Sequence, residues 1–389
     1  MQNESTIGVV GSAIHAPGHA DRRSLEEALY AVTRSALRDA GLSIDDIDGI
    51  VVAGNDQLDG RAISVMAASG SVGGVGRDIL STPSAAEHAF VLAALRILSG
   101  QFRTQLVVSW SPTEVTSVSD ALHLGTDPYF HRALPLDELS AAALQATALE
   151  SVEPGLHDAA IAIVCKNRSH GALAYPERIP APMENVWIAS GRPVCWPLTE
   201  GMISPPAFGA VALVLADRAT IADRGLRHAA WIRGLGWATE SGFLGDRDLA
   251  QLPSLAAASE QAYRAAGIGD PANAFDLAEV ADATPYQELL AYEGLGLCAR
   301  DDWIARVADG HFGSTGRVPV NLSGGALAYN PVYCAGLVRI AEAANQIRGR
   351  AGNHQMQDAK CVVAHAASGF AMQYNTVVVM GSDGERVRR

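Results

Sequence analysis

The sequence predicts an α/β fold made of two similar halves, and two internal repeats support this prediction. In the first repeat, an Ala-rich helix ends at a glycine and leads through an acidic link into an apolar strand, at residues 24–53 and again at residues 254–280. In the second repeat, a helix that ends in glycine precedes another apolar strand, at residues 92–110 and again at residues 340–365. Because strands and helices alternate in both copies, we expect helices to cover predominantly parallel sheets.

Each half begins with its own short apolar strand. The first strand is predicted at residues 7–11 and opens an N-terminal half of residues 1–222. The second is predicted at residues 231–236 and opens a C-terminal half of residues 223–389. We expect the two halves to pack around a shared pseudo-twofold axis.

Residues 111–200 do not fit the repeat. This segment holds nine of the 18 prolines, and we interpret it as an insertion of helices and loops within the N-terminal half. An insertion of this kind can cover a substrate channel or form a subunit contact. The apolar run Ala207–Ala216 then returns as a buried strand.

The segment from residue 318 to residue 349 reads as a short strand, a glycine-rich loop and an Ala-rich helix. Gly324 and Gly325 would let the backbone come close to a ligand, and Asn321 and Asn330 offer side-chain amides on either side. These four residues are therefore candidates for binding. A βα turn that only needs glycine explains the pattern equally well.

Composition excludes several classes of protein. The hydrophobic content of 48% is that of a globular protein, and the net charge of −13 argues against a nucleic-acid partner. The five cysteines are scattered without a Cys-x-x-Cys pair, so neither a disulfide framework nor a metal site is expected. The N-terminus has no basic region, and the longest apolar stretch is too short to cross a bilayer. We therefore expect a cytoplasmic protein without a membrane segment.

Several motifs resemble the thiolase superfamily over essentially the whole chain. They are the duplicated halves, the Asn321-Leu-Ser-Gly-Gly turn before a helix, the strand pair between Cys361 and Met380, and the Ala281-Asp-Ala-Thr-Pro-Tyr-Gln-Glu-Leu segment. The last is similar to the His-Asp-Cys-Phe segment of the sterol-carrier-protein type thiolases. The resemblance implies a five-layer αβαβα fold. It also implies coenzyme A thioesters as substrates, without a metal or redox cofactor, and an acyl-accepting cysteine at a helix N-terminus.

The chain departs from this family at the nucleophile. Counting back from Ser99–Gly100 places Pro83, or with a slip of one residue Ser84, where the family has its cysteine. A serine needs an adjacent base to become a nucleophile, and His88 lies one helical turn beyond Ser84. The two can form a Ser/His pair. An ordinary N-terminal serine and a histidine on the helix face would give the same sequence.

Other family positions are also exchanged. Ala281 stands where the His-Asp-Cys-Phe type has its histidine, although Asp282 is retained. Asn330 replaces the histidine of the Gly-His-Pro motif, and it can polarise a carbonyl but cannot take up a proton. His365 falls near the position of the second cysteine. The remaining candidates for proton transfer are His365, Asp282, Tyr286 and Tyr329.

Three functional interpretations follow. In the first, the chain is an enzyme of lipid metabolism that cleaves or forms a C–C bond next to a coenzyme A thioester without an acyl-cysteine, as its similarity to the steroid side-chain aldolases implies. In the second, it is an acyltransferase that works with a small zinc-ribbon/OB-fold protein; residues 110–114 and 127–137 resemble that group. In the third, it is a non-catalytic subunit, paired with another thiolase-like chain.

The shape of the site should separate these interpretations. A cavity that ends between Ser84, Asn330 and His365 would favour catalysis, whereas a pocket filled by Tyr329 or Phe370 would favour a non-catalytic subunit. We also expect the protein to form a dimer, either with itself or with a related chain, that buries an apolar interface.

Overall fold

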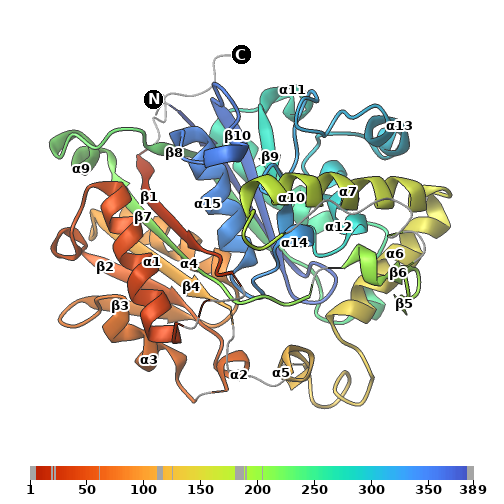
Figure 1. Ribbon diagram of the computed structural model, residues 1–389, viewed down its shortest axis with the longest axis horizontal. Helices are drawn as coiled ribbons and strands as arrows, with labels where there is room; N and C mark the ends of the chain where they lie inside the picture. Colours follow the sequence, from red (N-terminus) through yellow and green to blue (C-terminus); the bar gives the residue numbers. More distant parts are fainter. Residues whose placement is uncertain are drawn as a thin grey trace.

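The computed structural model describes residues 6–18, 21, 23–60, 62–111, 117–124, 126–179, 188, 191–203 and 205–382. Within these ranges, nine strands form one sheet in the order β3-β2-β4-β7-β1-β8-β11-β10-β9 (Figure 1). Their bounds are β1 Ile7–His15, β2 Gly49–Ala53, β3 Asp78–Thr82, β4 Thr104–Trp110, β7 Ala210–Asp217, β8 Ala230–Thr239, β9 Leu277–Glu279, β10 Cys361–Ser368 and β11 Tyr374–Gly381. The short strands β5 (Pro193–Cys195) and β6 (Leu198–Thr199) pair separately.

The strand order contains the predicted repeat. In the first half, the order from the middle of the sheet outward is β1, β7, β4 and β2. The first two pairings, β1–β7 and β7–β4, are antiparallel, and the pairing β4–β2 is parallel. Strands β8, β11, β10 and β9 follow with the same pairings. The equivalent of β3 is the short segment at Val320, which forms a parallel bridge to Ala278. The two copies meet where β1 pairs with β8, so the duplicated fold continues across one sheet.

The prediction of predominantly parallel sheets is wrong, because five of the eight neighbouring pairings are antiparallel. Parallel pairing occurs among β2, β3 and β4 and between β9 and β10, where a helix-containing connection carries the chain back between strands. Strands β10 and β11 instead follow one another through a short turn and must run antiparallel.

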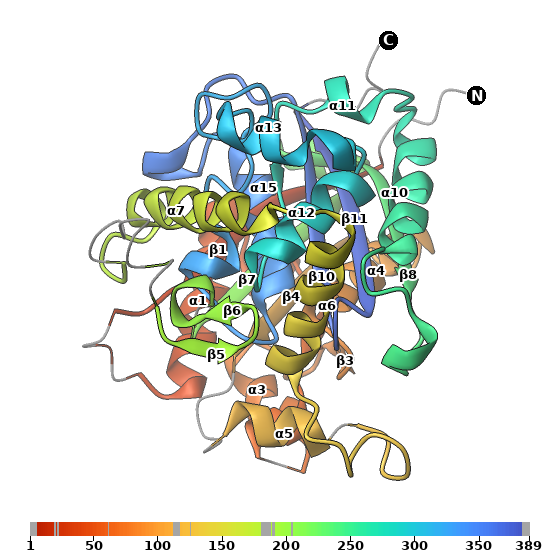
Figure 2. The ribbon, with the colours of Figure 1, turned by 90° about the vertical axis from the view of Figure 1, so that its right-hand side faces the viewer.

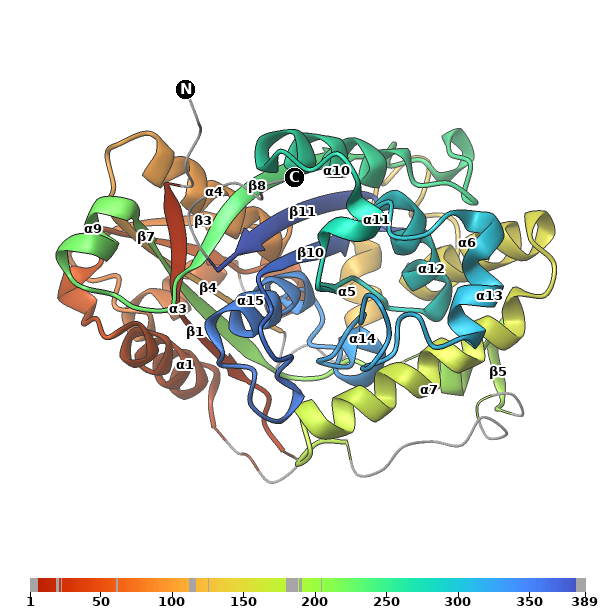
Figure 3. The ribbon, with the colours of Figure 1, turned by 90° about the horizontal axis from the view of Figure 1, so that it is seen from above.

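The two halves of the sheet form two β layers: one hydrophobic core surrounds the helices between them, and two further cores lie under the outer helices, which confirms the αβαβα fold (Figure 3). Side chains alternate along the strands: in β10, Val362 packs toward the central helices, whereas Val363 packs toward the outer helices of the second half. The central layer consists of α4 (Ala86–Leu98) and α15 (Ala335–Arg348), and helix α1 (Leu25–Ala40) covers the outer face of the first half. Helices α10 (Pro253–Ala266) and α12 (Pro285–Gly294) cover the second half.

The remaining helices connect or extend these layers. They are α2 Asp56–Asp59, α3 Ser64–Ser71, α5 Val118–Leu124, α6 Glu138–Val152, α7 Leu156–Ala174, α9 Arg218–Asp223, α11 Pro271–Ala274, α13 Trp303–Ala308 and α14 Gly325–Ala328. Short 3-10 turns are η1 Ile44–Asp46, η2 Glu200–Met202, η3 Leu244–Asp246, η4 Arg300–Asp302 and η5 Gly352–His354. In the described ranges, no helix is both long enough and apolar enough to cross a membrane.

The inserted segment packs on the second half, although it interrupts the first half in sequence. Helices α6 and α7 contact α12, and α7 also contacts α13 and α14 (Figures 1 and 2). Residues 112–116, part of the stretch that resembles the complex-forming acyltransferases, lie outside the described ranges. The predicted division at residues 222 and 223 falls at the end of α9 and stays a prediction.

Candidate active site

A cavity of about 1200 Å³ lies where the inserted segment faces both halves of the fold. Its walls come from α2, α5, α6, the loop before α12, the start of α15 and the turn between β10 and β11. Of the side chains predicted as functional, Ser84, Asp282 and Asn330 line it. Other polar lining residues include Asn55, Thr284, Gln287, Tyr333, Arg339 and Ser368. Phe370 lies on the wall and leaves the cavity open.

Ser84 stands just before α4, at the end of a loop held by two hydrogen bonds. The Tyr333 hydroxyl donates to the carbonyl oxygen of Thr82 over 3.0 Å, and Nδ2 of Asn55 donates to the carbonyl oxygen of Pro83 over 3.4 Å. The Ser84 side chain is exposed and lines the cavity. The residue at the N-terminal end of the central helix α4 is therefore a serine and not a cysteine.

The structure brings Ser84 and His88 together. Ser84 Oγ lies 2.8 Å from Nδ1 of His88 and 3.0 Å from Oγ1 of Thr82. The imidazole packs edge-on against the ring of Tyr374 at 5.5 Å between centroids, and burial lowers the pKa of His88. A neutral imidazole with an unprotonated Nδ1 can accept the proton of the serine hydroxyl near neutral pH.

Asp282 lies at the cavity floor, where the backbone of the glycine-rich loop wraps around its carboxylate. The backbone N–H of Ala326 donates to Oδ1 over 2.6 Å, and Nδ2 of Asn167 donates to Oδ2 over 2.7 Å. Burial, together with the neighbouring Glu288 carboxylate, raises the pKa of Asp282 well above its ordinary value. Asp282 therefore organises the floor and is not an exposed base.

The predicted binding role of the glycine-rich loop needs correction, because Asn321, Gly324 and Gly325 do not line the cavity. At Gly325 a Cβ atom would stand 2.0 Å from Oδ2 of Asp282, so the close approach of the backbone serves this carboxylate. Asn321 accepts from the N–H of Val280 over 2.7 Å and is completely buried. The loop thus supports the floor from behind.

Asn330 lines the cavity as predicted, at a point where two parts of the fold meet. Its carbonyl oxygen accepts from the N–H of Ala207 over 2.8 Å, and its backbone forms a bridge with Pro206. The residue is half-buried. Asn330 thereby lies in the cavity wall, within the loop that precedes α15.

His365 was predicted near the second cysteine of the family, but its side chain is sealed inside the second half. Its Nε2 lies 2.9 Å from Oδ1 of Asn375, and the residue does not line the cavity. Complete burial lowers the pKa of His365 to about 4. The imidazole is therefore neutral and out of reach of a ligand in the cavity.

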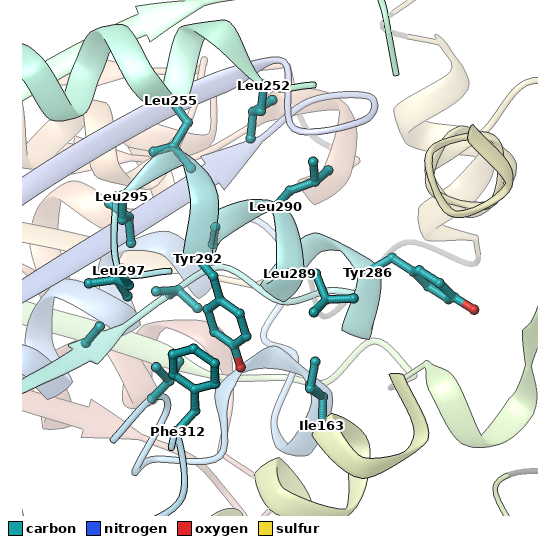
Figure 4. Packing of buried hydrophobic residues seen from close by; sticks show 14 of the residues in the cluster. Ile163, Leu252, Leu255, Tyr286, Leu289, Leu290, Tyr292, Leu295, Leu297 and Phe312 are labelled. Atoms are coloured by element: carbon teal, nitrogen blue, oxygen red, sulfur yellow. The ribbon is translucent and has the colours of Figure 1, made fainter. Parts of the chain in front are cut away.

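Tyr286 and Tyr329 also lie away from the cavity. The Tyr286 hydroxyl donates to the carboxylate of Glu150 on α6, and Figure 4 shows its side chain extending from α12 away from Leu290 and Tyr292. The Tyr329 hydroxyl donates to the carbonyl oxygen of Phe208 over 3.0 Å. Burial raises the pKa of both tyrosines, which makes proton release from them harder.

Sequence reasoning missed three polar residues of the site. Arg339 and Thr284 line the cavity, yet each is at most 2% exposed, and Glu87 lies just behind the wall. The signal in the sequence is helical spacing: Glu87 shares the buried face of α4 with Phe90 and Ala94. A charged residue on an apolar stripe is a candidate for function, because burying it without a role would cost stability.

The comparisons with known proteins agree with this architecture. Residues 238–382 match the family model described as thiolase C-terminal domain-like. The structure named "Ltp2-ChsH2(DUF35) aldolase" superposes on 97% of this chain and 98% of that chain with a TM-score of 0.79 at 20% identity. The chain has a thiolase-like fold. At this identity the superposition establishes the fold and not the reaction.

Relatives by sequence match smaller parts of the chain. Benzoylsuccinyl-CoA thiolase subunit BbsB of Thauera aromatica is 28% identical over 218 residues, 55% of this chain and 56% of that protein. Sterol carrier protein 2 of Oryctolagus cuniculus is 30% identical over 185 residues, 46% of this chain and 33% of that protein. The acetyl-CoA acetyltransferase of Methanothermobacter thermautotrophicus is 30% identical over 170 residues, or 43% of each chain. The matches thus span about half or less of these relatives.

Two chemical features of the cavity follow from the residue types on its walls. None of the five cysteines lines it, so the cavity offers no thiol for an acyl-enzyme. In the described part of the chain, no group of three or more His, Cys, Asp or Glu side chains is arranged to hold a metal ion. Besides the Ser84–His88 pair and the polar floor, the cavity wall carries the ionisable side chains of Asp127, His131, Asp137, Glu138 and Asp246.

Proposed function

We propose that the protein is an enzyme that cleaves or forms a C–C bond next to the thioester of an acyl-coenzyme A by aldol chemistry, without a covalent acyl-cysteine. The observation that carries this proposal is the cavity of about 1200 Å³ with Ser84 on its wall and His88 at 2.8 Å behind the serine. Its apolar lining, which includes Leu122, Leu139 and Phe243, suits an acyl chain. The open cavity reaches Ser84 and Asn330, two of the three residues named above as a sign of catalysis, whereas His365 does not line it.

In the cleavage direction, the Ser84–His88 pair takes up the proton of a 3-hydroxyl group. Ser84 Oγ accepts the substrate proton while its own proton passes to Nδ1 of His88. The electron pair of the former O–H bond forms the carbonyl of the leaving product, and the Cα–Cβ bond breaks. Its electrons move to Cα and the thioester oxygen as an enolate, and we assign the Asn330 amide to stabilise this enolate by a hydrogen bond. Protonation of Cα completes a thioester shortened by the leaving carbonyl compound.

The test is turnover of a panel of 3-hydroxyacyl-coenzyme A esters, followed by mass spectrometry of both products. We expect Ser84→Ala and His88→Gln each to lower kcat/KM by about a hundredfold or more, because each removes one member of the proton-accepting pair. Ser99→Ala, a serine at the other end of the same helix, is the matched control and should retain the wild-type rate. Equal rates in wild type, Ser84→Ala and His88→Gln would reject the proposed base.

A second candidate function is that of a non-catalytic subunit in a heteromeric complex. The exchanges at Ala281 and Asn330 and the missing thiol favour it. The names of two similar proteins also favour it, since one is a thiolase subunit and the other is the Ltp2-ChsH2(DUF35) aldolase. The partner would be another thiolase-like chain or a small zinc-ribbon/OB-fold protein. Native purification with mass spectrometry identifies such a partner. A complex that keeps full activity with the Ser84→Ala chain would then support the subunit function over the enzymatic one.

A further inference from the structure

We propose that the Glu87 carboxyl is a second proton-transferring group of the cavity, acting through the hydroxyl of Ser368. This inference rests on the proposed aldol chemistry, which needs an acid for Cα as well as a base for the hydroxyl. Glu87 itself does not touch the cavity, so its role is to hold and supply a proton behind the wall. Ser368 is the residue that meets the substrate.

The burial of Glu87 is the first observation behind this inference. It lies in the first turn of α4, is 1% exposed, and faces the apolar centre of the molecule between α4 and α15. Among the described residues no cation forms an ion pair with it, and its Oε1 atom has no hydrogen-bond partner. A carboxyl in such a place is costly to ionise and stays protonated more easily than an exposed one.

The thin wall between Glu87 and the cavity is the second observation. Gly336 lines the cavity, and a Cβ atom at this position would stand only 2.4 Å from Oε2 of Glu87. The absence of a side chain at residue 336 therefore leaves room for the carboxyl directly behind the wall. An alanine in the same place would displace it.

Ser368 is the third observation, because it connects the carboxyl with the cavity. It lines the cavity at the end of β10, and its Oγ atom is buried without a hydrogen-bond partner among the described residues. The Ser368 side chain lowers the pKa of the Glu87 carboxyl and so opposes the effect of burial. Glu87 and Ser368 thus each have a buried polar atom without a partner among the described residues.

The electrostatic surroundings allow Glu87 to hold and release a proton near neutral pH. Burial, the dominant influence, raises the pKa of the carboxyl to about 7. The titratable neighbours are His88 on the same helix and Tyr333 ahead of α15, whose own pKa is raised by burial and by Glu87. Asp56 and Asp59 on α2 act on Tyr333 in the same direction. Before His88 accepts a proton, its lowered pKa leaves it neutral, so none of these groups then carries a positive charge that would force Glu87 to stay ionised.

The proton transfers balance over one catalytic cycle. The enolate Cα takes the hydroxyl proton of Ser368, and Ser368 takes the proton of the Glu87 carboxyl, so that a C–H bond and a carboxylate are formed. The proton that His88 received from the substrate hydroxyl is released to solvent, and Glu87 takes up a proton before the next cycle. No oxidant or further reactant is required.

The experiment measures the proton of Glu87 separately from turnover. In the infrared spectrum, we expect a carboxylic-acid C=O band that is lost in Glu87→Gln, titrates near pH 7 in the wild type and shifts when acetyl-coenzyme A is added. Ser368→Ala should keep the band and lose the ligand-induced shift. Glu27→Gln, which alters an exposed glutamate on α1, is the matched control and should change neither.

A second readout is exchange of the Cα protons of acetyl-coenzyme A with deuterium from the solvent. We expect Glu87→Gln and Ser368→Ala to slow this exchange at least tenfold while binding of acetyl-coenzyme A, followed by calorimetry, is retained. If the Glu87→Gln variant cleaves and exchanges at the same rates as the wild type, the role of Glu87 is overturned and the aldol function stands. If the wild-type protein shows neither turnover nor a ligand-sensitive band, the aldol function and the Glu87 role are both overturned. If it shows a ligand-sensitive band but no turnover, the result supports Glu87 as a group of the cavity.

Discussion

Gly325 and Gly349 share a left-handed backbone, with φ values of 65° and 68°, but differ in what surrounds them. A Cβ atom at Gly325 would stand 2.0 Å from the Asp282 carboxylate, while nothing lies within 4 Å of the same position at Gly349. We expect Gly349→Ala to lower the free energy of unfolding by about 1–2 kcal/mol, the cost of the backbone conformation alone. Gly325→Ala should cost about 1–3 kcal/mol more, because it also overpacks the floor of the cavity.

Urea denaturation of the two variants measures this difference, with Gly349→Ala as the control. The double variant Gly325→Ala/Asp282→Asn keeps the overpacking, since the amide is as large as the carboxyl, and should be no more stable than Gly325→Ala alone. Asp282→Ala removes the colliding atoms, so the Gly325→Ala change should cost less in that background. Equal losses at the two glycines would contradict the described contact.

His365 predicts a pH dependence of stability. Because its pKa is lowered to about 4 in the folded protein, from an ordinary value of 6.5, the unfolded chain binds more protons between these pH values. Stability from this residue is thus fully present above pH 6.5 and is lost as pH falls toward 4. At pH 5 the loss should be roughly 2 kcal/mol relative to pH 7.5.

The measurement compares urea denaturation of wild type and His365→Gln at both pH values. Glutamine can still bond to Asn375 but does not titrate, so the variant should lose less stability on acidification than the wild type. Parallel losses in the two proteins would show that the burial of His365 does not contribute.

At single residues, the sequence predicted identities better than orientations. The Ser84–His88 spacing correctly indicated side chains that can meet, since residues four apart lie on one helix face. Tyr286 and Tyr329 were predicted because a tyrosine hydroxyl can transfer a proton. Their positions in the sequence, however, do not reveal whether the side chains face the cavity or point away from it. Glu87 was missed because its chemistry depends on Gly336 and Ser368, which are far away in the chain.

Helices α7 and α12 are joined by a buried ion pair that ties the inserted segment to the second half. Nζ of Lys166 lies 2.9 Å from Oε1 of Glu288, whose side chain is completely buried. Asn167 on the same helix bridges Glu288 and Asp282 with hydrogen bonds of 2.6 and 2.7 Å. The position of α7 therefore affects the cavity floor directly.

Removal of one partner should be far more harmful than removal of both. We expect Lys166→Met to lower the free energy of unfolding by about 3–5 kcal/mol, because it leaves the Glu288 carboxylate buried without its cation. Lys166→Met/Glu288→Gln should recover a large part of this loss. Thermal unfolding measures both variants, and an exposed pair, broken by Arg264→Ala next to Glu260, serves as the control with a change within about 1 kcal/mol. A Lys166→Met variant as stable as the control would contradict the importance of this pair.

Among the larger elements, the sequence predicted the repeated helices and strands but not the packing of the insertion. Periodicity and glycine caps are local, and the cap at Gly41 and its counterpart at Gly267 both adopt the expected left-handed conformation. The contact of α7 with α12 depends on Lys166 and Glu288, which are 122 positions apart, and no local pattern encodes such a pairing. Strand direction failed for the same reason, since it depends on which strands become neighbours.

At the scale of the whole molecule, the duplication was predictable because each copy carries its own local signals. The two copies meet through only two residue pairs of β1 and β8, at Gly8 with Trp231 and Val9 with Ala230. The central layer of α4 and α15 supplies most of the remaining contact between them, through a single apolar core. The cavity and Glu87 sit at one end of this layer, so the halves must stay in register for the site to form.

The outer edge of the sheet leads to a prediction about assembly. Strand β3 ends the sheet, and the described residues place no further strand beside it. Apolar side chains are exposed here: Leu80 on β3 is 45% exposed and Leu98 at the end of the adjoining α4 is 59% exposed. An unpaired edge with apolar neighbours favours pairing with a second chain. We therefore expect a homodimer through β3 when the protein is purified alone.

Light scattering coupled to size-exclusion chromatography tests this assembly. Leu80→Lys and Leu98→Glu should each shift the mass from dimer to monomer at micromolar concentration, because each places a charge in an apolar contact. Leu173→Glu is the matched control, since Leu173 on α7 is 55% exposed but far from β3 in sequence and fold, and it should remain dimeric. A monomeric wild-type protein would contradict the predicted homodimer. Natively purified protein would then show whether a different chain covers the β3 edge. Thr82 ends this edge strand and Ser84 follows two residues later, so loss of the dimer should also lower the rate of the Ser84-dependent reaction.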